Sequence, residues 1–245
     1  MIDARTGAVV YAPNLDWQDV PLGSRLAEAF GVPVIVENDV RAAAWGEFRF
    51  GAGRGATSLV AVFVGTGIGS GAILDGALWR GAGNAAGEVG HTQVVPDGVP
   101  CPCGQRGCLE QYAAGSGFQR RLAAALEGGV ATRLGDLTEG DPARLTAEMV
   151  ARTAEAGDPL ARQLWADATR FLSLGLANYV TLLNPQALVL GGGVMETVPA
   201  LFETVAPAVR RLTTLVAREG LRIERARLGD WSGVVGAADL AGAHA

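Results

Sequence analysis

The sequence predicts an α/β fold, and three observations carry that prediction. Short apolar runs rich in β-branched residues have the length of buried strands, at residues 32–36, 58–64 and 187–190. Segments with apolar residues at helical spacing alternate with them, at residues 21–30, 40–50 and 159–183. The chain of 245 residues is 49% hydrophobic, which suffices for the core of one large domain or two small ones.

The first 50 residues are expected to form strand, helix, strand and helix. A strand at residues 7–11 precedes a helix over residues 21–30, which the next glycine ends. The run at residues 32–36 has the pattern of a strand buried on both faces, and it leads into Asn38 and Asp39, at the end where open α/β sheets hold ligands. Asp39 then lies near the positive end of a helix, where a plain N-cap is its alternative role.

The next segment is a predicted hairpin with a glycine-rich loop. The strand at residues 58–64 is followed by Gly65, Thr66, Gly67, Gly69 and Gly71 and then by a returning strand. A dinucleotide-binding turn would continue as a helix, so that motif is excluded here. The free amides and the Thr66 hydroxyl are suited to phosphate oxygens, and a tight hairpin without a ligand is the alternative.

The second half of the chain is expected to be mostly helical. Helices are predicted at residues 111–126, from 142 onward, at 159–183 and at 234–243, with a polar connection at 128–142. The long helix has an apolar face with small positions, typical of core or of a subunit interface, formed by Leu160, Leu164, Ala168, Phe171, Gly175, Tyr179 and Leu182. Gly191, Gly192 and Gly193 follow the last buried strand and either admit a nucleotide or form a close packing turn.

One imidazole and all three cysteines lie within residues 91–108. His91, Cys101, Cys103 and Cys108 are the ligand set of a closed tetrahedral Cys₃His zinc site. Because four protein ligands leave no open position for a water, the ion is expected to be structural. Three separate buried thiols are the alternative.

Two carboxylates, Glu88 and Glu110, lie beside these ligands in the sequence. A metal that fixes His91 and Cys108 also fixes where both carboxylates point. Carboxylate oxygens accept hydrogen bonds from hydroxyl groups, so the pair is suited to a polyol such as a sugar. Each carboxylate taken alone would more often be a solvated surface group.

Composition excludes several classes of function. No apolar run reaches the ~18 residues that span a bilayer, and the first residues have no leader pattern, so we expect a soluble, cytoplasmic protein with no membrane partner. The net charge is −5 and the basic residues form no cluster longer than a pair, which argues against a nucleic-acid surface.

Taken together, these motifs resemble the ROK family of bacterial sugar kinases and sugar-responsive repressors, most closely its glucokinases. The resemblance extends over APNLDW from residue 12, VENDVRAAAWGE from 36, FVGTGIGSGAI from 63, EVGH from 88, CPCGQRGCLE from 101, LVLGGGV from 188 and VVGAADLA from 234. It implies an actin-like, RNase H-like two-lobed fold. Residues 1–38, completed by the helix at 234–245, would belong to the small lobe, and residues 39–233 would form the large lobe.

The resemblance also implies a function and its residues. The family function is ATP-dependent phosphorylation of a hexose, most readily glucose to glucose 6-phosphate, with Mg²⁺ accompanying ATP and a homodimer or larger assembly of the chain. Asp39 would be the base, and the sugar would be held by Asn38, Asp39, Glu88, His91 and Glu110. The nucleotide would be held by Thr66, Gly67, Gly191, Gly192 and Gly193.

The chain departs from the family pattern in two places. The Asp-x-Gly-Gly-Thr phosphate loop with which family kinases begin is not found in it, so we expect an incomplete small lobe, weak but specific sugar binding and severely reduced phosphoryl transfer. Arg41 stands where the family usually has Asn, and it is expected either to alter the surroundings of Asp39 or to reach a phosphate. A sugar-binding sensor related to the repressors, or a remnant that only binds sugar or self-associates, is the alternative to a kinase.

Overall fold

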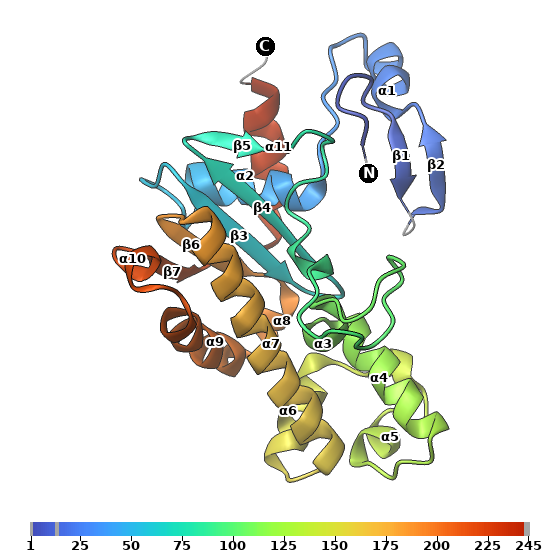
Figure 1. Cartoon of the computed structure of the whole chain (residues 1–245). Helices are drawn as coiled ribbons and strands as arrows, with labels where there is room; N and C mark the ends of the chain where they lie inside the picture. The colour runs from blue at the N-terminus through green and yellow to red at the C-terminus, as the bar shows by residue number, and fades with distance from the viewer. Residues whose placement is uncertain (1, 13–14, 243–245) are drawn as a thin grey trace.

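The computed structural model describes residues 2–12 and 15–242, and a five-stranded sheet lies at its centre (Figure 1). The strand order is β5-β4-β3-β6-β7, where β3, β4 and β5 are antiparallel and β3, β6 and β7 are parallel. Their bounds are β3 (Leu59–Val64), β4 (Ile68–Leu74), β5 (Ala77–Trp79), β6 (Ala187–Gly191) and β7 (Arg222–Arg225). A separate antiparallel pair, β1 (Val9–Ala12) and β2 (Trp17–Val20), lies with α1 apart from this sheet (Figure 1).

Helices cover both faces of the sheet. In chain order, the α-helices of the described residues are α1 (Leu22–Phe30), which lies apart from the sheet, α2 (Asp39–Phe50), α3 (Glu110–Ala113), α4 (Gly115–Glu127), α5 (Arg133–Leu137), α6 (Ala147–Glu155), α7 (Pro159–Leu183), α8 (Gly193–Thr197), α9 (Pro199–Leu212), α10 (Leu215–Arg218) and α11 (Ser232–Gly242). Short 3₁₀ turns are η2 (Val89–His91), η3 (Pro142–Arg144) and η4 (Gly229–Trp231). None of the helices in the described part of the chain has both the length and the apolar character that crossing a bilayer requires.

The alternation of side chains along β3 divides the core into two layers. Val60, Val62 and Val64 face the larger layer, which α4, α6, α7 and α9 complete. Leu59 and Ala61 face the smaller layer, which α2 and α11 complete. Because both faces of β3 are covered, its sequence is continuously apolar rather than alternating.

Helices α2 and α11 pack unusually closely. A Cβ added at Gly46 or at Gly236 would collide with a backbone carbonyl of the opposite helix, so these positions require glycine. The Trp45 indole N–H donates to Asp239 Oδ2 at 2.8 Å across the same contact. The C-terminal helix is therefore fixed to the helix that begins at Asp39, and the division into lobes at residues 38 and 234 stays a prediction, with residues 243–245 outside the described residues.

One predicted strand is wrong. Residues 32–36 form no strand, and Val32 and Ile35 are exposed. Neither sheet of the described residues includes this segment, and an extended run without a neighbouring ladder cannot satisfy its backbone groups as a strand. It instead crosses between α1 and α2, where Val36 packs against Gly7.

Most other expectations are confirmed with local corrections. The glycine-rich segment is a hairpin, but Gly69 and Gly71 lie inside β4 rather than in the loop. The helix expected at 111–126 is broken at Ala114 into α3 and α4, and the connection at 128–142 contains α5. Helix α7 has the predicted bounds and packs Gly175 against Leu109, while Leu182 is 79% exposed, which excludes the core and leaves the other predicted role, a subunit interface, untested. Pro13 and Asn14 of the motif at residues 12–17 lie outside the described residues.

Candidate functional site

The four predicted metal ligands converge. Their nearest ligand atoms all lie within 4.8 Å of one another, with Cys101 and Cys108 buried, His91 half-buried and Cys103 exposed. The loop turns back on itself through Gly104 and Gly107, both at positive φ, and a Cβ at Gly107 would collide with the Val95 carbonyl. The Cys101 N–H donates to the Gln105 carbonyl at 2.8 Å, which closes the turn that carries Cys103.

The spacing of the ligand atoms fits zinc. A tetrahedral ion with ordinary Zn–S and Zn–N distances places two thiolates ~3.8 Å apart and a thiolate and an imidazole nitrogen ~3.6 Å apart. The Cys103 and Cys108 sulfurs are 3.6 Å apart, and His91 Nδ1 is 3.7 Å from Cys101 Sγ. Since Nδ1 faces the sulfurs, the opposite ring nitrogen, Nε2, remains available to a ligand outside the metal centre.

The thiols have unequal acidities. Burial raises the pKa of the Cys108 thiol to about 12, and burial also raises the pKa of Cys101. At Cys103 burial acts in the same direction, but hydrogen bonds from the Gln105 N–H and the neighbouring thiols outweigh it and lower the pKa. A bound cation would deprotonate all three, because a coordinated thiol is held as thiolate.

The sugar-side candidates meet at the beginning of β4. A Cβ at Gly69 would lie 2.7 Å from Val40 Cγ2, so α2 brings Asp39 to this end of the strand. The 3₁₀ turn that ends in His91 packs Gly90 directly against the Ile68 carbonyl. We call residues 67–70 the β4 entry.

Glu110 and Glu88 are both fixed to the β4 entry. Glu110 Oε2 accepts the Ile68 N–H at 3.1 Å and lies against Gly67, where a Cβ would come within 2.7 Å. The Ser70 hydroxyl donates to the Gly87 carbonyl, next to the exposed Glu88. Asp39 is exposed as well, so at least two carboxylates are open to a ligand.

The N-cap of α2 is Asn38, and not Asp39, for which that role was the alternative. The Asn38 side chain caps α2 by accepting the Arg41 N–H at 2.9 Å, and Asp39 is the first residue of the helix. Asp39 is therefore not the N-cap, and its carboxylate has no capping hydrogen bond among those of the described residues.

Two of the five nucleotide-side candidates, Thr66 and Gly193, line a cavity of about 300 Å³. Gly65 and Thr66 from the hairpin turn and Gly193 from α8 contribute to its wall, together with Ser116 at the beginning of α4. The hairpin turn and α4 are joined by two backbone hydrogen bonds, Gly115 N–H to the Gly65 carbonyl at 2.9 Å and Ser116 N–H to the Thr66 carbonyl at 3.0 Å. Gly67 lies outside this wall, on the side of Glu110.

The three consecutive glycines at 191–193 are not equivalent. A Cβ at Gly191 would lie 2.7 Å from Ala226 Cβ, and one at Gly192 would lie 2.6 Å from the Val64 carbonyl oxygen. Gly192 also has φ +90, so both positions are explained by close packing between β3 and the turn after β6. Gly193 has open space and lines the cavity, so it is the glycine of this turn that a ligand can approach.

Arg41 does not reach toward a phosphate site. Its side chain is buried, with Nε 2.7 Å from Glu37 Oε1 and both terminal nitrogens donating to Asn84 at 2.8 and 3.0 Å. Arg80 holds the other oxygen of Glu37 at 2.6 Å, and the Asn84 amide donates to the Ile2 carbonyl at 2.8 Å. Arg41 thus fixes the loop that leads to Glu88 onto the beginning of α2.

Sequence reasoning missed Tyr179 and Gln111 as neighbours of the site. Burial raises the pKa of the Tyr179 hydroxyl, Ser70 lowers it and the charge of Glu88 raises it further, which places this α7 residue beside both. Gln111 is fully buried and donates to Cys101 Sγ at 3.3 Å. The sequence predicted Tyr179 only as part of the apolar face of the long helix, in the core or at a subunit interface, and Gln111 only as a helix residue.

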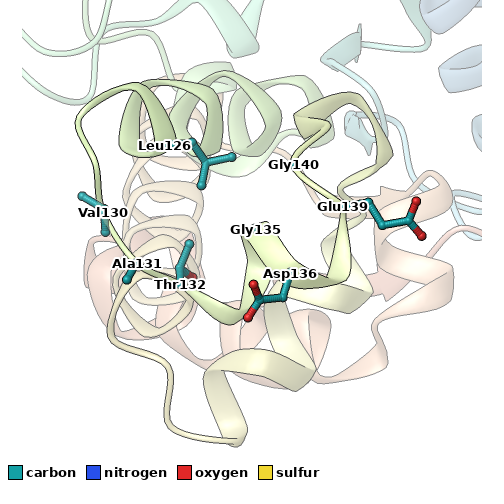
Figure 2. Close-up of a pocket in the computed structure, with 8 residues that line it drawn as sticks. All are labelled: Leu126, Val130, Ala131, Thr132, Gly135, Asp136, Glu139 and Gly140. Carbon is teal, nitrogen blue, oxygen red and sulfur yellow. The ribbon is translucent and has the colours of Figure 1, made fainter.

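A second cavity, of about 600 Å³, lies away from these residues at the α4–α5 connection (Figure 2). Leu126, Thr132 and Asp136 surround it, and the Glu139 carboxylate points outward, where it pairs with Arg144. It contains none of the predicted site residues. We therefore place the candidate site at the β4 entry and the 300 Å³ cavity.

The family model described as the ROK family matches residues 1–244. The chain belongs to the ROK family. Its α/β fold is the actin-like fold of ROK sugar kinases, as the resemblance implied. Of the residues that the resemblance assigns to the sugar, Glu110 contacts the β4 entry directly, and Asp39 and His91 lie next to residues packed against it.

Three relatives illustrate the range of the family. The chain is 36% identical to a glucokinase of Streptomyces coelicolor over 98% of its own length and 77% of that protein. It is 31% identical to a xylose repressor of Caldicellulosiruptor bescii over 96% of its length and 59% of that protein. A crystal structure of a ROK family glucokinase from Streptomyces griseus in complex with glucose and AMPPNP superimposes with a TM-score of 0.78 at 38% identity, covering 98% of this chain and 78% of the other.

Proposed function

We propose that this protein transfers the γ-phosphoryl group of ATP to a hexose, with glucose as the first candidate and glucose 6-phosphate as the product. One observation carries the proposal: the carboxylate and imidazole candidates and the phosphate-side hairpin turn meet at the β4 entry, where Glu110 accepts the Ile68 N–H next to Gly67. Relatives named as glucokinases, at 36% identity, support the same assignment.

Each residue has a defined task in this proposal. Asp39 accepts the proton of the attacking hydroxyl as the new O–P bond forms and ADP leaves. Asn38, Glu88, His91 and Glu110 hold the remaining hydroxyls, since carboxylate oxygens accept hydrogen bonds from hydroxyl groups and the Nε2–H of a metal-bound imidazole donates one. Thr66 and Gly67 approach the phosphates, and the turn at 191–193 lies on the nucleotide side through Gly193. Mg²⁺ bound with ATP would neutralise phosphate charge.

The metal centre is proposed as a structural zinc site. His91, Cys101, Cys103 and Cys108 would hold the ion, and His91 would present its second nitrogen to the sugar. The ion would thereby fix the orientation of the ring and of the loop that precedes Glu110.

Binding and transfer are tested separately on one preparation. Calorimetry with glucose measures binding, and a coupled assay of ADP release measures transfer. Asp39→Asn is expected to lower ADP release by about 10²–10⁴-fold while glucose binding persists, because the base acts only in the chemical step. Asp136→Asn is the matched control, an exposed Asp in the first turn of α5 on the other cavity, and it should change neither measurement.

A non-catalytic sugar-binding protein is the second candidate, and the identity to a xylose repressor favours it. It predicts heat of binding with glucose or xylose and no ADP release above the Asp39→Asn background. If neither sugar binds, both candidates are wrong.

A further inference from the structure

The proposed metal centre and the proposed nucleotide cavity are joined by an unbroken series of side-chain hydrogen bonds. Gln111 Nε2 donates to Cys101 Sγ at 3.3 Å, and Arg120 Nε donates to Gln111 Oε1 at 2.9 Å. The Arg120 terminal NH2 group then donates to Ser116 Oγ at 2.9 Å. Ser116 lines the cavity and donates its own N–H to the Thr66 carbonyl at 3.0 Å.

The chemistry of the donors fixes the direction of this series. Arginine can only donate, so the Gln111 oxygen must face Arg120 and the Gln111 N–H₂ must face sulfur. Gln111 is fully buried, and a buried amide donor needs an acceptor. A metal-bound thiolate is a strong acceptor and a neutral thiol is a weak one, so occupancy of the metal centre strengthens the first link.

The other end of the series acts on the cavity. Because Arg120 donates to Ser116 Oγ, the Ser116 hydroxyl keeps its own proton for an acceptor such as a phosphate oxygen in the cavity. Helices α3 and α4 pack too closely to move independently, since a Cβ at Gly117 would lie 2.5 Å from the Glu110 carbonyl oxygen. A shift of Gln111 is therefore transmitted to the beginning of α4.

We propose that Gln111 and Arg120 are positioning residues that couple the metal centre to nucleotide binding. The inference rests on the proposed function, which assigns zinc and nucleotide to these two places. Coupling between two ligands is reciprocal, so zinc must strengthen nucleotide binding by the same factor as nucleotide strengthens zinc binding.

The test measures both factors with AMPPNP and zinc. AMPPNP affinity is measured by calorimetry on zinc-loaded and on chelator-treated protein, and zinc affinity by equilibrium competition with a chelator, with and without AMPPNP. We expect the two factors to agree and to be about fivefold or larger. In Arg120→Met, which removes the donors but keeps the stem, the factor should fall toward one.

Two comparisons exclude a purely structural effect. Arg152→Met, which removes an exposed arginine that pairs with Glu148 on α6, should keep the wild-type factor. If the metal-free protein unfolds, AMPPNP binding depends on zinc through folding alone, and the coupling factor is then as large in Arg120→Met as in wild type. That result would overturn the proposed coupling through Gln111 and Arg120. If wild type binds AMPPNP equally well with and without zinc, the proposed coupling through Gln111 and Arg120 is wrong and the proposed function is unaffected. Failure of zinc-loaded wild type to bind AMPPNP overturns both.

Discussion

The metal side and the nucleotide side of this site are built in opposite ways. The metal side takes all four ligands from residues 91–108, and two thiols there are neutral without a cation because burial raises their pKa values. The nucleotide side assembles Thr66, Ser116 and Gly193 from separate elements around a cavity, where backbone hydrogen bonds join the hairpin turn to α4. The proposed zinc would therefore hold together ligands that are close in the sequence, whereas the nucleotide side is assembled by the tertiary fold.

The largest effect should come from breaking the metal side. Cys103→Ser leaves no internal cavity because Cys103 is exposed, but a hydroxyl is a poor zinc ligand. We expect zinc affinity to fall by more than the ~100-fold loss that follows when a residue hydrogen-bonded to a metal ligand is replaced. Glucose affinity should fall as well, because His91 and Glu110 lose their fixed positions. Elemental analysis and glucose calorimetry measure the two effects.

Gln105→Ala provides the control for that variant, because Gln105 is an exposed residue of the same loop and is not a metal ligand. It should retain zinc. Glucose affinity that survives the loss of zinc unchanged would show that the metal does not organise the sugar side.

A smaller effect is expected from the buried ion pair at the beginning of α2. Arg41→Met removes the partner of Glu37 and of Asn84, but Glu37 keeps Arg80. We expect a loss of about 3 kcal/mol in the free energy of unfolding, at the low end for a broken buried pair. Glucose binding should also weaken, because the loop that carries Glu88 is no longer held against α2. Denaturant unfolding measures the first quantity.

The matched control is Arg49→Met on the same helix, where the half-exposed arginine pairs with Asp239. Its cost should stay below about 1 kcal/mol because solvent screens this pair. Equal costs for the two variants would mean that the Arg41 network does not hold the sugar side together.

The nucleotide side can be tested through its consecutive glycines. Gly192→Ala forces a side chain onto a positive φ and against the Val64 carbonyl, so we expect a cost of about 2 kcal/mol in stability. Gly193→Ala has open space and should change stability by no more than about 0.5 kcal/mol while weakening AMPPNP binding. The opposite order in thermal unfolding would contradict the packing role of Gly192.

The smallest effect on stability is expected from a variant that changes no residue of the metal side or the nucleotide side. Asp158 caps α7 and accepts from Ala161 N–H and Thr132, and although burial would raise its pKa, these hydrogen bonds outweigh burial and lower it. A lowered pKa stabilises the fold above the unfolded value of about 3.9, and that contribution is lost as the pH falls through the folded value. Asp158→Asn keeps one acceptor oxygen and removes the other, so it should cost about 1 kcal/mol at pH 7 and less below about pH 4. A cost that does not depend on pH would contradict this assignment.

The contrast between the two sides also explains what could be predicted from sequence. The ligands of the metal side are neighbours in the chain, so their spacing predicts their convergence. The bounds of α7 and the hairpin of β3 and β4 were also predictable, because local periodicity and turn glycines determine them.

The features that were missed depend on tertiary partners. Residues 32–36 have the composition of a strand but no neighbouring strand among the described residues, and Leu182 continues an apolar periodicity past the end of the core. The role of Arg41 depends on Asn84, which is distant in sequence, and that of Gln111 depends on Arg120 across a helix break. No local pattern reveals such pairs.

The central claim is that one site joins a zinc-fixed sugar pocket at the β4 entry to a nucleotide cavity beside it. The most direct measurement is a crystal structure of the protein with glucose and AMPPNP, with anomalous scattering at the zinc edge. We predict zinc among His91 and the three cysteines, glucose in contact with Asp39 and Glu110, and the nucleotide phosphates against Thr66. Glucose bound away from Asp39, or a nucleotide outside the cavity lined by Thr66 and Gly193, would contradict the account.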